Sequence, residues 1–307
     1  MEKYLWSKRV LDVDNYNIIQ SEGVTNFNTI QEVIKKNKNI IWIRNTSAIQ
    51  YFNTDLNFFG ELLNKITHPV ILVTSDGTRP VPSSYKPELV EKLLNSDKII
   101  KWYTQNYDKS IMHPKLSYYP IGLDMHTESW LPIPVNSNIK DPLSIEYENI
   151  RQEKMKMYYT IREKYKEKKD LRIFCDSHLR ITHHKRAEMF EKLKNNSYIE
   201  LLNERIDYDK VFELYSKHQF VLSPIGRGLD CHRTWEVFLL GSIVITETSP
   251  LDNMFINNNL PVIILNNFSE LNNITDEQLE KWKNDYMKYT DINNIKEKMD
   301  PEYWIKL

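Results

Sequence analysis

Seven short apolar runs, separated by stretches with helical spacing, constrain the fold of this 307-residue chain more than any other feature. The runs are rich in β-branched residues and largely continuous, which is typical of strands that are covered on both faces. They are NIIWIR (39–44), PVILVT (69–74), KIIKWY (98–103), LRIFCD (171–176), HQFVLS (218–223), SIVIT (242–246) and LPVIIL (260–265). Amphipathic helices are expected between them, for example over 184–195 and 207–216. This alternation favours doubly wound α/β sheets with parallel strands.

The distribution of proline divides these strands into two groups. Nine of the 13 prolines lie between residues 69 and 142, and the Pro-, Asn- and Ser-rich segment SWLPIPVNSNIKDP (129–142) is the expected linker. We therefore predict an N-terminal Rossmann-like domain over 1–132 and a C-terminal one over 143–274, facing each other across a cleft. Charged helices over 275–307 are expected to pack across the junction between the two domains.

Composition excludes several classes of protein. Hydrophobic residues make up 41% of the chain and charged residues 27%, as in soluble globular proteins. The net charge of −1 gives no overall field that favours nucleic acid, and two cysteines, Cys175 and Cys231, are too few for a disulfide scaffold. The charged N-terminus lacks the apolar core of a signal peptide, and no apolar run reaches the roughly 18 residues of a membrane span. We expect a soluble, cytoplasmic protein without a transmembrane segment or a nucleic-acid partner; the sequence does not indicate its oligomeric state.

A glycine-containing loop is the clearest candidate site. The segment SPIGRGLDCHRTWEVFLLG (223–241) contains Gly226, Gly228 and Gly241, three of the seven glycines of the chain, and it joins an expected strand to an expected helix. Ligands of open α/β sheets bind outside the carboxyl ends of the strands. Glycine lets backbone N–H groups approach an anion closely, and a helix N-terminus adds partial positive charge. The loop is therefore expected to bind phosphate.

Side chains at the start of this helix extend the expectation from phosphate to nucleotide. Arg233 can form two hydrogen bonds with a phosphate group, and Glu236, one helical turn after His232, can accept hydrogen bonds from two ribose hydroxyls. The candidate nucleotide-binding residues are Gly226, Arg227, Gly228, Asp230, His232, Arg233 and Glu236. The alternative is a tight turn in which Arg233 and Glu236 form a surface ion pair. The dinucleotide fingerprint G-x-G-x-x-G is not met, because Cys231 occupies the place of its third glycine.

The segment LSPIGRGLDCHRTWEVFLLGSIVITETSPLDNMF…LPVIIL resembles the signature of exostosin-like glycosyltransferases. The shared pattern is a strand ending in Ser-Pro, a glycine loop, Asp/His/Arg, Trp-Glu, a glycine, a strand, an SPL turn and an apolar strand. Upstream, LVTSDGTRPVPSS, KWYTQNYD and HPKLSYYPIGLD are similar to N-terminal segments of short viral or microbial members. The resemblance is strongest over residues 218–265 and extends from about residue 70 to 268.

This resemblance implies a GT-B architecture and an inverting transfer of sugar from a nucleotide-sugar donor to a glycan acceptor. The donor is expected to be UDP-linked and to bind in the C-terminal domain as a substrate, while the N-terminal domain holds the acceptor. Arg233 would contact the diphosphate and Glu236 the ribose. No metal or other cofactor is implied, so cationic side chains and a helix N-terminus must stabilise the leaving diphosphate.

Two further stretches are rich in basic residues. Six basic side chains lie at positions 178–186, where Arg180 or Arg186 would supply a second cation for the diphosphate; the alternative is a solvated basic start of a helix. A metal site built from the imidazoles and Asp176 is disfavoured, because neutral imidazole ligands sit poorly among three cations. The lysine-rich stretch 151–169 is expected to be a solvated helix face, because its lysines alternate with glutamates.

An inverting transfer also needs a general base that takes the proton of the acceptor hydroxyl. Asp76, directly after the strand at 69–74, is the first candidate; Asp124, beside His126, is the second, and His113 is the third. Asp76 can instead be an Asx-turn residue ahead of a glycine. Two other functions stay open: a nucleotide-dependent oxidoreductase, disfavoured by the missing third glycine, and a sugar-nucleotide-binding protein without activity.

Overall fold

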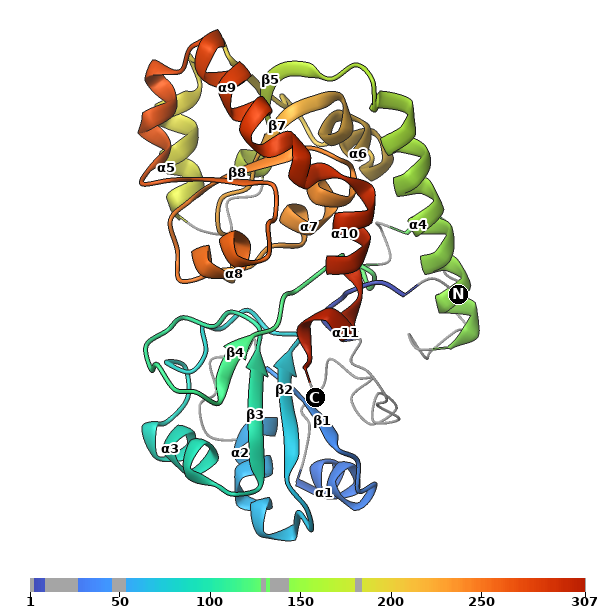
Figure 1. Ribbon diagram of the computed structural model, residues 1–307, viewed down its shortest axis with the longest axis vertical. Coiled ribbons are helices and arrows are strands. Elements are labelled where there is room, and N and C mark those ends of the chain that lie inside the picture. The colour runs from blue at the N-terminus through green and yellow to red at the C-terminus, as the bar shows by residue number, and fades with distance from the viewer. Residues whose placement is uncertain are drawn as a thin grey trace.

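The computed structural model describes residues 3–8, 27–45, 54–127, 131–132, 144–179 and 184–306, which form two α/β units, one above the other in Figure 1. The N-terminal unit contains four parallel strands in the order β1-β2-β3-β4. The strands are β1 (Ile40–Arg44), β2 (Val70–Ser75), β3 (Ile99–Thr104) and β4 (Leu116–Tyr118). The helices are α1 (Phe27–Lys35), α2 (Asp55–Glu61), η2 (Leu63–Lys65) and α3 (Pro87–Asn95). Their apolar faces cover the sheet and form a buried core around Leu72 and Trp102.

The C-terminal unit contains five parallel strands in the order β6-β5-β7-β8-β9. The strands are β5 (Asp170–Cys175), β6 (Ile199–Leu201), β7 (His218–Leu222), β8 (Ile243–Glu247) and β9 (Val262–Leu265). The helices are η4 (Ser177–Leu179), α5 (His184–Leu193), α6 (Tyr208–Lys217), α7 (His232–Leu239), α8 (Asp252–Asn257) and η5 (Phe268–Asn273). The chain first adds β6 on one side of β5 and then crosses to β7 on the other side. The strand order therefore reverses between β5 and β7.

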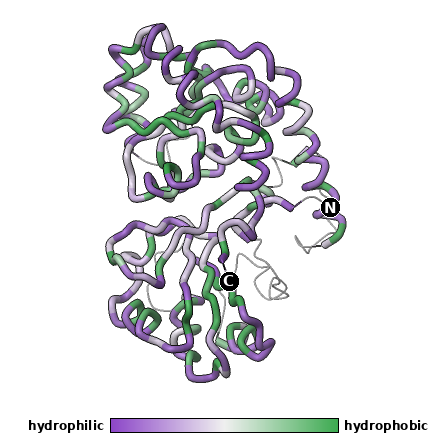
Figure 2. The backbone as a smooth tube through the Cα atoms, viewed as in Figure 1, coloured by the Kyte–Doolittle hydropathy of each residue, from purple (hydrophilic) through white to green (hydrophobic). Residues whose placement is uncertain are grey.

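The expected fold class is confirmed: both units are parallel α/β sheets, and residues that follow strands of each unit face the other unit, as in a GT-B architecture. All seven expected strands are present, and α5 and α6 confirm the helices expected over 184–195 and 207–216. Figure 2 shows the apolar residues concentrated along these strands. The strands β4 and β6 were not predicted, because each has three residues of which only the first is buried. Within the described residues, no helix has the length and apolar character that crossing a membrane requires.

The C-terminal segment contacts both units. It comprises α9 (Asp276–Tyr286), η6 (Met287–Thr290), α10 (Ile292–Met299) and α11 (Pro301–Trp304). The ring of Trp304 lies 5.7 Å from that of Trp235 in the C-terminal unit, and the main-chain N–H of Lys306 donates to Tyr103 Oη of the N-terminal unit at 3.1 Å. In Figure 1, α11 lies between the two sheets. The last helices therefore bridge the two units.

The long helix α4 (Ile145–Tyr165) corrects one expectation from the sequence. A solvated face was expected over 151–169, but Arg151, Lys154 and Arg162 are buried. Arg151 Nε donates to Met125 O at 2.9 Å, and Arg162 Nη1 donates to the carbonyl of Leu239 at 3.0 Å, near the end of α7. These arginines lie on one face of α4, since they are eleven residues apart, which is about three helical turns. Their cations bind carbonyl groups of both units, including the negative end of a helix dipole.

Candidate functional site

A cavity of about 310 Å³ lies where the strand order of the C-terminal sheet reverses. Asp176 and Leu179 follow β5 and line it on one side, and residues of the loop after β7 line it on the other. Thr78 and Ile121, which follow β2 and β4 of the N-terminal unit, complete the wall. The carboxyl ends of both sheets thus meet at this cavity. Ligands of doubly wound sheets bind at such a reversal, so the topology marks the cavity as the first candidate site.

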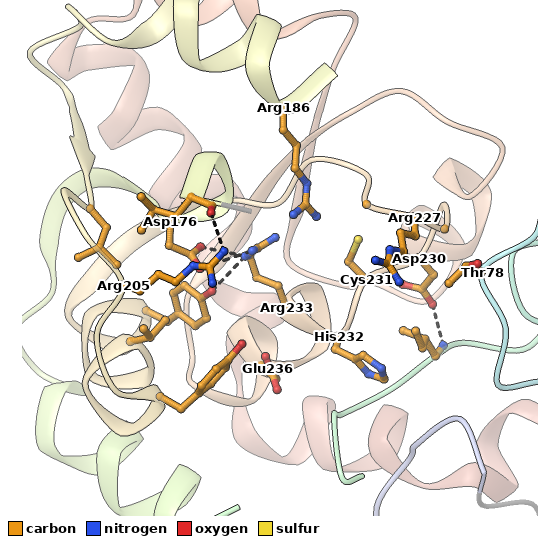
Figure 3. Close-up of a pocket in the computed structure, with 18 of the residues that line it drawn as sticks. Thr78, Asp176, Arg186, Arg205, Arg227, Asp230, Cys231, His232, Arg233 and Glu236 are labelled. Atoms are coloured by element: carbon orange, nitrogen blue, oxygen red, sulfur yellow. Dashed lines mark hydrogen bonds and ion pairs between the residues drawn. The ribbon is translucent and has the colours of Figure 1, made fainter. Parts of the chain in front are cut away.

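Four arginine side chains line the cavity, as Figure 3 shows. Arg186 comes from α5, Arg205 from the loop after β6, Arg227 from the glycine loop and Arg233 from the first turn of α7. Arg205 and Arg227 are exposed, whereas Arg186 is buried. Guanidinium groups bind phosphate oxygens through paired hydrogen bonds, and several of them suit a ligand with more than one phosphate. The cationic side of the cavity therefore fits a diphosphate.

Arg233 is held in place by two partners. Its Nε lies 3.0 Å from Asp176 Oδ1 and 3.0 Å from Tyr215 Oη, and its Nη2 lies 3.4 Å from Asp176 Oδ2. Burial would lower the pKa of Arg233, but Asp176 beside it holds this pKa well above the usual value. The surface ion pair between Arg233 and Glu236 that the sequence allowed is therefore wrong, because Asp176 takes that place. The guanidinium is fixed at the cavity with its charge retained.

The side of the cavity next to α6 is mainly apolar. It is formed by Leu202, Ile206, Tyr208 and Val211, which belong to the β6–α6 connection and to the start of α6. A flat apolar group such as a nucleobase fits this wall better than it fits the arginines. The cavity therefore combines a cationic part with an apolar part, which is the combination that a nucleoside diphosphate needs.

Glu236 lies in the wall of the cavity, one helical turn after Arg233. Its side chain is buried, and its Oε1 accepts a hydrogen bond from Tyr158 Oη at 3.1 Å. Burial raises the pKa of Glu236, and the ammonium group of Lys154 opposes that rise. Tyr158 and Lys154 of α4 therefore hold the carboxylate in place, and it borders the cavity on the side where a diol can approach it.

Gly226 and Gly228 shape the loop through contacts within the protein, and their expected role at a phosphate stays a prediction. The N–H of Gly226 donates to the carbonyl of Gly228 at 3.1 Å, which closes a tight turn. A Cβ atom on Gly228 would lie 2.9 Å from Asn106 Nδ2 of the other unit, so the loop approaches the side chain of Asn106 closely at this position. Arg186 Nε donates to Ile225 O at 3.0 Å and holds the loop from the side of α5. Arg180, the other expected cation, lies outside the described residues.

Asp230, expected among the nucleotide-binding residues, joins the two units. Its Oδ2 accepts from the N–H of Ile121 at 2.7 Å, and its Oδ1 accepts from Trp235 Nε1 at 2.9 Å. Its own N–H donates to Asn106 Oδ1 at 3.0 Å. Burial raises the pKa of Asp230 to about 6, although the hydrogen bonds from Ile121 and Trp235 lower it. The carboxylate borders the cavity, and its two oxygens link Ile121 of the N-terminal unit to Trp235 of the C-terminal unit.

Asp230 gives a testable pH dependence. A carboxyl group whose pKa rises from 3.8 to about 6 on folding takes up its proton earlier in the folded state than in the unfolded chain. Its contribution to stability therefore grows as pH falls through about 6 towards 4, by roughly 2–3 kcal/mol. The free energies of unfolding in urea of the wild type and of Asp230→Asn, measured across this range, isolate the effect, since other groups titrate in both proteins. A difference between the two proteins that does not change with pH would contradict the raised pKa.

Asp124, His126 and His232 form a second cluster, at the junction of the units. One ligand-capable atom of each lies within 4.8 Å of the others, and His126 Nδ1 is 3.3 Å from Asp124 Oδ1. The arrangement does not fit a metal ion well. Asp124 Oδ1 already accepts from the N–H groups of His126 and Thr127, Oδ2 accepts from Thr127 Oγ1, and Lys154 Nζ lies 2.6 Å from the Asp124 carbonyl. Burial would raise the pKa of Asp124, but His232, His126 and Lys154 hold this pKa well below its usual range.

None of the three expected general bases lines the cavity. Asp76 has φ of 60°, in agreement with the turn alternative, and its Oδ2 lies 3.1 Å from Arg44 Nε and 3.7 Å from Lys8 Nζ. Asp124 is buried, with both oxygens hydrogen-bonded as described above. His113 precedes β4, so it lies towards the amino end of a strand whose carboxyl end faces the cavity, and its Nδ1 accepts from the N–H of Lys115. The positions of these residues do not support the role expected of them.

No protein-family model matches the chain, and no curated protein sequence matches it. Among solved structures, similar ones include "Trehalose-6-phosphate from E. coli bound with UDP-2-fluoro glucose", with 10% identity, a TM-score of 0.44, and coverage of 95% of this chain and 78% of that one. Apo OtsA has 10% identity and a TM-score of 0.45 over 91% and 74% of the two chains. WaaG, a glycosyltransferase involved in lipopolysaccharide biosynthesis, has 10% identity and a TM-score of 0.39 over 100% and 99%. All three TM-scores are below 0.5, so we take no activity from these likenesses.

Proposed function

We propose that this protein is a glycosyltransferase that moves a sugar from a nucleotide-sugar donor to a hydroxyl group of a glycan. The observation that supports this most is the cavity itself, which places four arginines beside an apolar wall at the carboxyl ends of the C-terminal strands. Thr78 and Ile121 bring the other unit to the same cavity, so that a second substrate can meet the donor there. An exostosin-like family relationship, suggested by the segment at 218–265, is part of the proposal.

In this proposal the donor spans both parts of the cavity. The base lies against Leu202 and Ile206, the ribose hydroxyls donate to Glu236, and the diphosphate is bound by Arg233 with help from the other arginines. The positive end of α7 adds to this field. Charge develops on the diphosphate as the glycosidic bond breaks, and preorganised cations stabilise it there. We therefore propose a transfer that needs no metal ion, and UDP as the nucleotide of the donor.

We propose inversion of the anomeric centre, by direct attack of the acceptor hydroxyl on the face opposite the diphosphate. Such a step needs a group that accepts the proton of the hydroxyl. A second candidate function, a sugar-nucleotide-binding protein without transfer, is favoured by the absence of the three expected bases from the cavity wall. The release of nucleoside diphosphate from the donor separates the two functions, because a binding protein leaves the donor intact.

Binding of nucleotides in the presence of EDTA tests the proposal. A ligand that binds only the folded state raises the melting temperature of the protein. We expect UDP to raise it more than GDP, CMP or TDP does. EDTA should leave the rise caused by UDP unchanged. UDP-sugars incubated with the protein should slowly release UDP. If none of the nucleotides binds, the proposed function is wrong; if binding or release requires added Mg²⁺ or Mn²⁺, the metal-free mechanism is wrong.

A further inference from the structure

We propose that His232 is the general base of the transfer, an inference that rests on the proposed function. His232 is the first residue of α7, it lines the cavity, and it is partly exposed. It belongs to the C-terminal unit, yet its Nδ1 lies 2.8 Å from the carbonyl oxygen of Gly122 in the N-terminal unit. The imidazole therefore stands at the boundary between the proposed donor side and the proposed acceptor side.

The contact with Gly122 decides which nitrogen of His232 carries the proton. A carbonyl oxygen only accepts, so Nδ1 must be the donor of this hydrogen bond. In the neutral ring, Nε2 then holds the lone pair. Gly122 has φ of 66°, and a Cβ atom there would lie 2.3 Å from the carbonyl oxygen of Leu5, so the backbone that presents this acceptor is closely fixed. The structure thus holds His232 as the tautomer that a base needs.

Charged groups from every neighbouring element face this imidazole. Asp124 and His126 come from the 121–127 loop, and the rings of His126 and His232 are 5.6 Å apart. Glu236 and Asp230 come from α7 and the loop before it, and Lys154 comes from α4. Three carboxyl groups therefore surround two imidazoles and one ammonium group. Among these carboxyl groups Asp124 is the one held most firmly in its ionised form, because His232, His126 and Lys154 lower its pKa.

The step that this geometry allows balances in atoms and charge. The acceptor oxygen attacks the anomeric carbon while Nε2 of His232 takes the hydroxyl proton. The new carbon–oxygen bond forms as the bond to the diphosphate oxygen breaks, and the electron pair leaves with the nucleoside diphosphate. The imidazolium then returns its proton to solvent. Asp124 acts as a positioning residue whose carboxylate stabilises the imidazolium, and Arg233 binds the leaving group.

The test is the release of UDP from UDP-glucose, UDP-galactose and UDP-N-acetylglucosamine with water as acceptor. His232→Gln should lower the rate by about 10²–10⁴-fold while UDP affinity stays within about threefold of the wild type. When the rate of UDP release is plotted against pH, the fall in rate on the acid side that the wild type shows should be absent from His232→Gln, because this variant has no imidazole at position 232. His113→Gln, at the far end of β4, is the matched control and should keep the wild-type rate and profile. For His232→Ala, added imidazole should restore part of the rate, and the melting temperature of each variant reports its folding.

Three outcomes overturn the inference. If His232→Gln keeps the wild-type rate, the base is another residue; if it loses UDP affinity as steeply as rate, His232 binds the donor. If EDTA abolishes UDP release and Zn²⁺ restores it, His232 belongs to a metal site together with Asp124 and His126. If the wild type binds no nucleotide and releases no UDP, the proposed function itself has failed, a result that is distinct because it appears before any substitution.

Discussion

Arg233→Ala is expected to weaken UDP binding by roughly 2–4 kcal/mol, about 30- to 1000-fold in Kd. The guanidinium is one of four that border the cavity, and it is fixed by Asp176 and Tyr215 at 3.0 Å each. Its removal takes away paired, charge-assisted hydrogen bonds to phosphate and leaves the Asp176 carboxylate uncompensated beside the diphosphate. Calorimetric titration with UDP measures the loss directly.

Two further variants test whether the loss of UDP affinity is specific to the guanidinium group of Arg233. Arg233→Lys keeps the charge but not the paired geometry, so its affinity should lie between those of the wild type and Arg233→Ala. Arg172→Ala is the matched control, because Arg172 lies on β5 in the same sheet but pairs with Glu200 and donates to Ser197 O away from the cavity. Equal affinity of Arg233→Ala and Arg172→Ala for UDP would contradict the assignment of the diphosphate to this cavity.

Lys154→Met is expected to lower the free energy of unfolding by about 3–5 kcal/mol, since removing one member of a buried ionic group leaves the others uncompensated. Lys154 is fully buried, its Nζ donates to the Asp124 carbonyl, and its charge acts on both Asp124 and Glu236. Without it, the raised pKa of Glu236 should rise further. The loss should therefore be largest near neutral pH and smaller as pH falls, because protonation of Glu236 in the folded state relieves the uncompensated charge.

Lys156→Met is the control for that loss. Lys156 lies two residues further along α4, its side chain is 70% exposed, and its ion-pair partner is the surface residue Glu153. A surface ion pair of this kind contributes about 0–1 kcal/mol. The free energies of unfolding of Lys154→Met and Lys156→Met, measured in urea, should therefore differ by about 2–5 kcal/mol. Similar small losses for both would mean that Lys154 does not neutralise the buried carboxylates.

The strands and the loop after β7 could be predicted because their signals are local. Seven strands are continuous β-branched runs, and the glycines, Arg233 and Glu236 lie in one segment of the chain. The short strands β4 and β6 have one buried residue each and leave no such run. Arg205 was missed for that reason, since its place after the carboxyl end of β6 becomes meaningful only when β6 is recognised.

The cluster at the junction could not be predicted, because it depends on contacts between distant parts of the chain. Lys154 lies in a stretch where lysine and glutamate alternate, and it is buried by the packing of α4 against α6, α7 and the 121–127 loop. The contact between His232 and Gly122 joins residues 110 positions apart. The role of Asp76 as a base stays a prediction from its position after a strand; in the structure Asp76 forms ion pairs with Arg44 and Lys8 and does not line the cavity.

A crystal structure of the protein with UDP, grown in the presence of EDTA, tests the central claim most directly. We predict the diphosphate within about 3 Å of the Arg233 guanidinium, the usual distance of a charge-assisted hydrogen bond, and the uracil against Leu202 and Ile206. We predict the ribose hydroxyls at Glu236, and no metal ion on the phosphates. A structure in which UDP occupies another surface, or in which the cavity at the carboxyl ends of β5 and β7 stays empty at saturating UDP, would contradict the account.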